Sequence, residues 1–252
     1  MEISLAAEKI GHLGSFPITN SILTSWIATI ILVLVAFIAT RNLKLVPKGI
    51  QNFFELVVEM LLNLVNSVMN DMAATKKYFP LLATIFLFII TNNWLGLFPG
   101  IGSIGFHEEL HGKEVFVPIF RGGNADLNTT LALAIIAVVA IQIFGVIAIG
   151  AGKYISKFLN FKSPILFFVG ILEFISELSR IISFSFRLFG NIFAGEVLLA
   201  VITMLLPFVG PLPFYGLEIF VGFIQALVFT MLALVFIKSA ITDHSEHEET
   251  AH

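Results

Sequence analysis

The sequence predicts an all-α integral membrane protein with five membrane-spanning helices. Hydrophobic residues make up 58% of the chain and charged residues 12%, whereas a soluble domain carries about 25% charged residues. A span needs about 20 mainly apolar residues. Five runs meet that length, and the fourth is long enough to require a strong tilt; they are Ser21–Thr40, Pro80–Phe98, Thr129–Gly150, Pro164–Pro207 and Phe214–Ile241.

Composition also excludes several classes of function. The chain has no cysteine, so a disulfide framework, a thiolate metal site and a cysteine nucleophile are all excluded. Its net charge is −3 and no basic patch stands out, which argues against nucleic-acid binding. Acidic residues in the first segment, MEISLAAEKIGHLGSF, favour neither a cleaved signal peptide nor a transit peptide. We expect the first apolar run to direct insertion itself.

The distribution of basic residues between the loops predicts the orientation. Cytoplasmic loops carry an excess of lysine and arginine. Loop 99–126 has only Lys113 and Arg121, set among acidic residues, and should face outside. The N-terminus is then outside and the C-terminus in the cytoplasm. The cytoplasmic basic residues are Arg41, Lys44, Lys48, Lys153, Lys157, Lys162 and Lys238.

This topology divides the chain into three segments. Residues 1–20 form an external N-terminal segment, and residues 21–79 hold the first span and a cytoplasmic amphipathic helix. Residues 80–252 form a helical bundle with a His- and Glu-rich cytoplasmic tail. The amphipathic helix, Val46–Met72, is expected at the membrane interface, or with its polar face against another subunit. That face consists of Asn52, Glu55, Glu59, Asn63, Asn66 and Asn70.

The run 164–207 is too long for an upright helix. Its interior, 165–206, would be about 63 Å long as one helix at 1.5 Å per residue, against a hydrocarbon core of about 30 Å. Only Gly190 and Gly195 interrupt its middle. We therefore expect one steeply inclined helix, kinked near one of these glycines, with a partner surface to lie along.

Polar residues within this run form one stripe. Glu173, Glu177, Arg180, Arg187 and Asn191 fall within roughly 80° of one another on a helical wheel. Glu196 points to a different face and lies nearer the outside. The last span carries two polar residues that share one face, Glu218 and Gln225.

Arg187 is the most informative residue, because a charged side chain at mid-membrane costs several kcal/mol. Carboxylates lie toward the cytoplasm on one side of it and toward the outside on the other. This order fits two separate aqueous half-paths with a fixed cation between them. An arginine cannot give up its proton at working pH, so it blocks a proton relay while attracting a carboxylate.

Several of these residues also have a purely structural interpretation. Glu177 and Arg180 stand at i, i+3 and could simply pair, and Asn191 could bond a neighbouring backbone carbonyl. Asp126 is as well placed for a helix N-cap as for a path. Asn92, Asn93 and Trp94 suit a membrane interface, and Glu196 and Glu218 could be buried structural carboxyls.

The segment Ser185–Glu196, SFRLFGNIFAGE, resembles the signature of subunit a of the F-type ATP synthase. ILEFISELSR before it, FIQALVFTMLALVF in the last span, NNWLGLFPG and ADLNTT resemble the same family in the same order. The resemblance covers most of 80–241. It implies two long tilted helices that wrap a ring of c subunits.

The resemblance also implies a role for each matching residue. Arg187 stands at the family's essential arginine, which faces the ring, and Asn191 at its asparagine one turn on. Glu196 matches the acid of the outer half-channel, and Glu218 the position of its His or Glu relay partner. Gln225 matches a glutamine close to the arginine. Glu173 matches an acid of the inner half-channel, whereas Glu177 has no assigned role.

The resemblance predicts the stator subunit of a rotary proton-translocating ATP synthase. The implied partners are the c-ring, peripheral-stalk b subunits and the lipid bilayer, in a bacterial inner membrane. We expect no catalytic site, nucleotide, metal or cofactor on this chain, since no P-loop is present. The alternative is a stand-alone proton- or sodium-coupled secondary transporter, which would need internal repeats that the two halves do not show.

Overall fold

The computed structural model describes residues 7–14, 16–41, 44, 46, 48–98, 100, 104–110, 113–158, 163–207 and 209–242. The His- and Glu-rich tail lies outside these residues. Long helices dominate the described chain, as expected for an all-α membrane protein. They are α1 (Asn20–Thr40), α2 (Ile50–Met69), α3 (Met72–Gly96), α4 (Leu127–Ile149), α6 (Pro164–Leu205) and α7 (Pro211–Ile241), with a short α5 (Ala151–Ser156).

Two antiparallel hairpins and a short 3₁₀ turn supplement the helices, and none of them was expected from the sequence. Strands β1 (Lys9–Leu13) and β2 (Phe16–Thr19) pair just before α1. Strands β3 (Gly105–Leu110) and β4 (Lys113–Pro118) pair between α3 and α4, followed by η2 (Gly123–Ala125).

Helix boundaries follow from capping residues. Thr19, Asp71 and Asp126 accept hydrogen bonds from the first-turn amides of α1, α3 and α4, as N-caps do. Helices α6 and α7 instead begin with a proline in the first turn, where its missing N–H costs nothing. The structure starts α3 at Met72, so the expected segment boundary at 79/80 falls inside a helix that contains Pro80.

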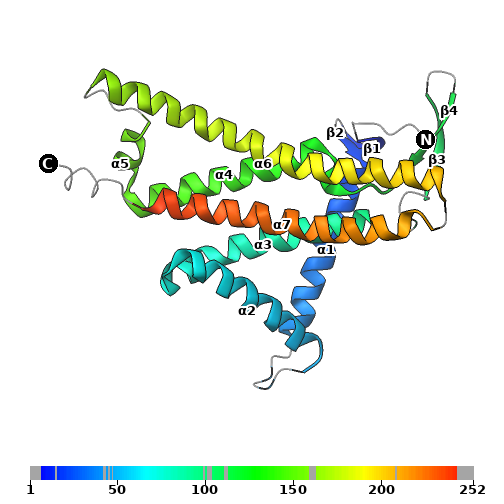
Figure 1. Cartoon of the computed structure of the whole chain (residues 1–252), viewed down its shortest axis with the longest axis horizontal. Helices are drawn as coiled ribbons and strands as arrows, with labels where there is room; N and C mark the ends of the chain where they lie inside the picture. Colours follow the sequence, from blue (N-terminus) through cyan, green and yellow to red (C-terminus); the bar gives the residue numbers. More distant parts are fainter. Residues whose placement is uncertain are drawn as a thin grey trace.

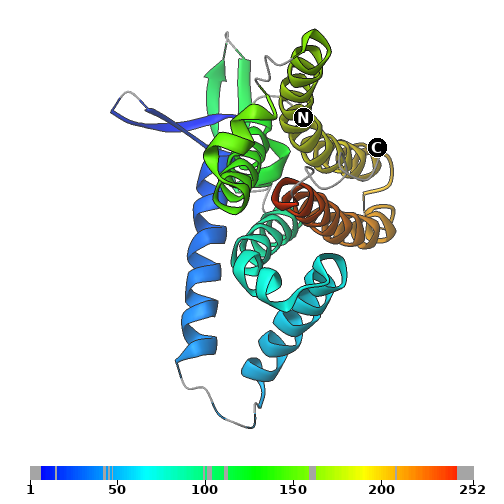
Figure 2. The ribbon, with the colours of Figure 1, turned by 90° about the vertical axis from the view of Figure 1, so that its left-hand side faces the viewer.

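Helices α3, α4, α6 and α7 run side by side, and α1 crosses them (Figure 1). Figure 2 shows the four helices nearly end-on and α1 along its length. Helix α6 is one continuous helix of 42 residues, as its length predicted, and its axis changes direction in its middle part (Figure 1). Because α6 runs crosswise to α1, both cannot stand upright in one membrane, which favours the expected tilt.

The two ends of the bundle carry different segments of the chain. One end carries both hairpins and the α6–α7 turn, whereas the other carries α5, the α2–α3 turn and the end of α7 (Figure 1). By length and apolar composition, six helices of the described chain could cross a membrane, α2 included. Helix α2 has the lowest mean hydropathy of the six, 1.3, and its interfacial position stays a prediction.

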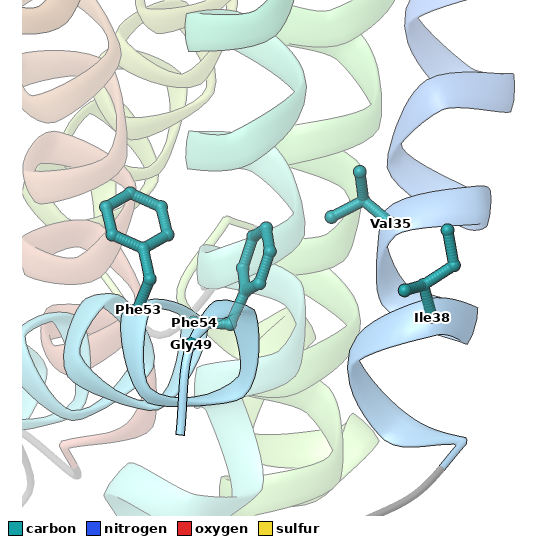
Figure 3. A pocket seen from close by; sticks show the side chains of 5 residues that line it. All are labelled: Val35, Ile38, Gly49, Phe53 and Phe54. Carbon is teal, nitrogen blue, oxygen red and sulfur yellow. The ribbon is translucent and has the colours of Figure 1, made fainter. Parts of the chain in front are cut away.

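The core lies between the four helices that run side by side. Phe184 of α6 stacks on Phe229 of α7 with their ring centroids 4.7 Å apart, and Phe86 of α3 meets Phe223 of α7 edge-on. Helix α2 adds Leu61, Val65 and Met69 to this core. Most of α1 lies away from it, and an open apolar groove separates the end of α1 from the start of α2 (Figure 3).

A lysine of α7 secures the end of α2. The ammonium of Lys238 donates to the carbonyl oxygen of Val68 at 2.7 Å. The last carbonyls of a helix have no partner within the helix, and a cation there also compensates the helix dipole. Asn70 then ends α2 in a left-handed conformation with φ 57°.

We expect Lys238→Met to loosen α2 from the bundle, because the charged hydrogen bond to the Val68 carbonyl contributes about 1.5–3 kcal/mol. Hydrogen exchange should become faster at the amides of α2, while the amides of α4 keep their protection. Lys76→Met is the matched control, since this lysine of α3 is exposed and has no ion pair among the described residues. Equal exchange in both variants would show that Lys238 does not hold α2.

Candidate functional site

Arg187 lies in the middle of α6 and faces away from the core. Its Nη2 donates to Ser183 Oγ at 3.0 Å, and no described carboxylate lies within ion-pair distance of it. Phe186 beside it is 55% exposed, and a Cβ added to Gly190 would meet nothing within 4 Å. The guanidinium is therefore a half-exposed cation on an open helix face, with its counter-charge not supplied by the described chain.

Of the two amides that were expected beside Arg187, the structure shows one in contact with it. Asn191 donates its Nδ2 to the carbonyl oxygen of Arg187 at 3.0 Å, which is the structural interpretation made from the sequence. Gln225 is half-buried on α7, which packs against α6. Among the described residues it makes no hydrogen bond to Arg187. The structure thus confirms the local contact of Asn191 and leaves the longer contact of Gln225 open.

At the end of the bundle that carries the hairpins, Glu196 forms an ion pair with Arg121. The Nη2 and Nε atoms of Arg121 lie 3.0 and 3.2 Å from Glu196 Oε2. Arg121 is only 8% exposed, and its guanidinium lies 5.9 Å from the centre of the Phe193 ring. Sequence reasoning recorded Arg121 only as a loop charge, because nothing local links residues 75 positions apart.

Glu218 of α7 lies directly against α6. It is 6% exposed, and a Cβ added to Gly195 would come within 2.1 Å of Glu218 Oε2. A larger residue at position 195 would therefore require the Glu218 carboxylate to shift. The expected proximity of the Glu196 and Glu218 carboxylates stays a prediction, and Glu218 makes no ion pair to another described residue.

At the opposite end, both inner carboxylates carry a cation partner. Glu173 Oε1 lies 2.7 Å from the ammonium of Lys157. Glu177 receives two hydrogen bonds from Arg180 Nη1, at 2.7 and 2.8 Å, which confirms the i, i+3 pair. The Arg180 guanidinium lies 3.8 Å from the centre of the Phe236 ring, so the pair also ties α6 to α7.

A buried tyrosine completes this inner region. Tyr154 of α5 donates its hydroxyl to Gln142 Oε1 and covers Gly145, where a Cβ would lie 2.3 Å from its ring. Burial raises the pKa of Tyr154 to about 12, and the negative charge of Glu177 acts in the same direction. Tyr154 therefore serves as a neutral hydrogen-bond donor and not as a proton source near neutral pH.

Asp126 is the N-cap of α4. Its Oδ1 accepts from the amide of Asn128 at 3.0 Å, and its Oδ2 from Ser21 Oγ at 2.8 Å. At 3% exposure, it joins α1 to α4, so the capping interpretation is confirmed. A path role for Asp126 stays a prediction.

Asn92 and Asn93 are buried between helices, and their expected depth at a membrane interface stays a prediction. They are 0% and 2% exposed. Asn93 donates to the Gly222 carbonyl at 2.8 Å and accepts from Asn124 at 2.7 Å, while Asn92 accepts from Ser25 at 3.1 Å. Buried amides need such partners, and these ones join α1, α3, η2 and α7.

Chemically, the described residues offer ionisable groups without a metal-binding cluster. No group of three or more His, Asp or Glu side chains in the described ranges could hold a metal ion. The ionisable side chains instead form a series along α6. Carboxylates with cation partners lie at each end, and one cation without a carboxylate lies between them.

A family model described as ATP synthase A chain matches residues 22–238. The chain is 32% identical over 236 residues to a protein named ATP synthase subunit a from Moorella thermoacetica. This alignment covers 94% of this chain and 97% of that protein. Proteins of the same name from Campylobacter jejuni subsp. jejuni and Geobacter sp. strain M21 are 35% and 37% identical. Each of these alignments covers 88% of this chain, and they cover 89% of the Campylobacter protein and 87% of the Geobacter protein.

A double-mutant cycle should show that Arg121 and Glu196 stabilise each other. We expect Arg121→Met to lower the thermal midpoint clearly, because it leaves a carboxylate without its cation. Adding Glu196→Gln should recover part of that loss. Because the Glu196 side chain is 36% exposed, solvent screening limits the coupling energy to about 1 kcal/mol.

The matched control pairs Arg187→Met with Glu196→Gln. These residues lie about 14 Å apart along α6, at 1.5 Å per residue, and share no contact. Their effects should add within about 0.5 kcal/mol. Additive effects for Arg121 and Glu196 as well would contradict the ion pair.

Proposed function

This chain belongs to the ATP synthase A chain family, and we propose that it performs the stator's part in rotary proton transfer through the side chains of α6 and α7. It is the proton-channel subunit of the membrane sector of an F-type ATP synthase. Making or hydrolysing ATP then falls to other subunits. The finer assignment to individual residues rests on the arrangement around Arg187.

The observation that carries the assignment is the unpaired guanidinium of Arg187. A cation within an apolar span needs a partner, and no described carboxylate is within ion-pair distance of it. The open face around it, with exposed Phe186 and Ile182, leaves room for a second surface. We assign that surface to the ring of c subunits, whose carboxylates pass Arg187 in turn.

The proton enters from the outer side past Glu218 and Glu196 and protonates a ring carboxylate. The neutral carboxyl then moves into lipid as the ring turns. On the inner side the ring carboxyl releases its proton past Glu173, beside Glu177. The driving force is about 2.3 kcal/mol per charge for each 100 mV of membrane potential, plus the pH difference.

Arg187 has two roles in this scheme. Its positive charge favours the ionised form of the ring carboxylate that faces it, so the proton leaves before that carboxylate passes. Its very high pKa also prevents it from relaying a proton, so the two half-paths stay separate. Asn191, bonded to the Arg187 carbonyl, and Gln225 on α7 complete the polar surface beside it.

The membrane setting follows from the relatives and the helices. The chain is a multi-pass protein of the bacterial inner membrane. We place the hairpin end of the bundle outside and α5 in the cytoplasm, on the basis of the basic loops. The peripheral-stalk b subunits are the second expected protein partner, and the comparisons do not favour a stand-alone transporter.

Replacing Arg187 tests the central assignment. Arg187→Ala should abolish proton-driven ATP synthesis in membranes while the complex still assembles, and it should permit a passive proton leak. Arg187→Lys should also be severely impaired, because a partly buried lysine can lose its proton. Ser179→Ala, exposed on the same helix, is the control. Synthesis at a near-normal rate in Arg187→Ala membranes would falsify the mechanism.

Single cysteines in this cysteine-free chain test the orientation. Lys48→Cys and His107→Cys both replace exposed side chains, so the introduced thiols should react readily. An impermeant maleimide should label position 48 from the cytoplasmic side and position 107 from outside, as measured in membranes of known sidedness. The opposite pattern would invert every depth assigned above.

A further inference from the structure

The N-terminal segment brings an additional carboxylate to the outer end of α6. Glu8 precedes β1 and is half-buried. Its backbone carbonyl accepts from the amide of Asn20 at 3.1 Å, and its Oε2 accepts from Asn20 Nδ2 at 3.5 Å. Asn20 is fully buried at the start of α1, so it fixes the position of Glu8.

The same turn of α1 also positions Arg121. Asn20 Nδ2 donates to the Pro118 carbonyl at 3.3 Å. One turn further on, Thr24 Oγ1 accepts from the backbone amide of Arg121 at 3.3 Å. The first two turns of α1 therefore contact both Glu8 and the segment that carries Arg121. Arg121 in turn holds Glu196 of α6.

The charges of these three groups act on one another. Burial raises the pKa of Glu8; the positive charge of Arg121 opposes this shift, and the negative charge of Glu196 adds to it. Of the other charged groups near it in sequence, Lys9 and His12 on β1 are exposed to solvent. Glu8 and Glu196 thus both lie within the electrostatic field of Arg121, whose ion pair is with Glu196.

We propose that Glu8 collects protons at the outer mouth of the half-path and passes them to Glu196, with Arg121 as the cation that the two carboxylates share. This proposal rests on the proposed function, in which Glu196 belongs to the outer path. It adds a donor from a segment outside the matched family region, 22–238.

In this relay, Glu8 carries the exchangeable proton first. A proton from the outer water binds a carboxylate oxygen of Glu8, which loses its negative charge. When that proton moves to Glu196, the new O–H bond on Glu196 weakens its ion pair with Arg121. The positive charge of Arg121 then compensates the negative charge that returns to Glu8. Release of the proton deeper into the path restores the Arg121–Glu196 pair.

The test compares proton-driven ATP synthesis in proteoliposomes that contain the whole complex, as a function of pH on the outer side of this chain. A collecting carboxylate matters most when protons are scarce. Glu8→Gln should therefore lower the rate of ATP synthesis at alkaline outer pH. We expect a decrease of roughly tenfold, which is the lower end of the rate changes that electrostatic focusing produces. The variant should match the wild type at mildly acidic outer pH. Lys9→Gln, an exposed charge next to it, should keep the wild-type profile.

A cysteine at the same position separates proton collection from charge alone. Glu8→Cys can be modified by methanethiosulfonate reagents that carry either a carboxyethyl or a sulfonatoethyl group. Both restore a negative charge, but a sulfonate does not bind protons near neutral pH. Only the carboxyethyl adduct should recover synthesis at alkaline outer pH. Equal rescue by both reagents would reduce Glu8 to an electrostatic role and overturn the proposal.

Glu196→Gln distinguishes the two possible failures. If Glu196→Gln slows synthesis while Glu8→Gln keeps the wild-type pH profile in assembled complexes, only the role of Glu8 is wrong. If Glu196→Gln also leaves synthesis unchanged, the outer path itself is misplaced. A loss in Glu8→Gln that is equal at every outer pH would also contradict proton collection, because it would indicate a general structural defect.

Discussion

The rest of the structure is arranged around one constraint, namely that a charge within an apolar helix must be compensated. Helix α6 carries two arginines, and they meet this constraint in different ways. Arg180 has a carboxylate at 2.7 Å and an aromatic ring beneath it, so its charge is compensated within the chain. Among the described residues, Arg187 bonds the Ser183 hydroxyl and has no carboxylate within ion-pair distance. In the proposed function its counter-charge comes from the ring, so that Arg187 binds a passing carboxylate and then releases it, whereas the charge of Arg180 is already compensated.

The length of α6 gives this cation its position between two sets of carboxylates. At 1.5 Å per residue, Glu177 and Glu196 lie about 15 and 14 Å from Arg187 along the helix, in opposite directions. An upright helix would place much of its 42 residues beyond a core of about 30 Å. An inclined helix keeps all of these groups within or near the membrane. In the proposed function, a single α6 thus carries an inner group, an outer group and the barrier between them.

Local sequence patterns predicted the features that depend on neighbours in the chain. The extent of α6, the cap at Asp126, the Glu177–Arg180 pair and the bond from Asn191 to the Arg187 carbonyl all lie within one or two helical turns, where spacing decides geometry. The missed contacts join distant segments, as Arg121 does with Glu196 and Lys238 with Val68. They depend on how loops return to the bundle, which periodicity does not encode. The roles of Glu218 and Gln225 came from the family resemblance and not from spacing.

The two carboxylates at the hairpin end of the bundle, Glu196 and Glu218, have different surroundings. Glu196 is held by Arg121, whereas Glu218 enters the α6–α7 interface at Gly195, where a larger residue would require the Glu218 carboxylate to shift. One carboxylate therefore has a fixed cation and the other has none within the described chain. Neutralising Glu196 leaves the charge of Arg121 uncompensated, whereas neutralising Glu218 does not. A proton that moves between the two carboxylates therefore changes the charge balance at each step. In the proposed relay, Arg121, which Thr24 of α1 holds, compensates that change because a second carboxylate, Glu8, lies within its electrostatic field. The N-terminal segment is thereby linked to the chemistry of α6, although most of the chain's length separates the two in sequence.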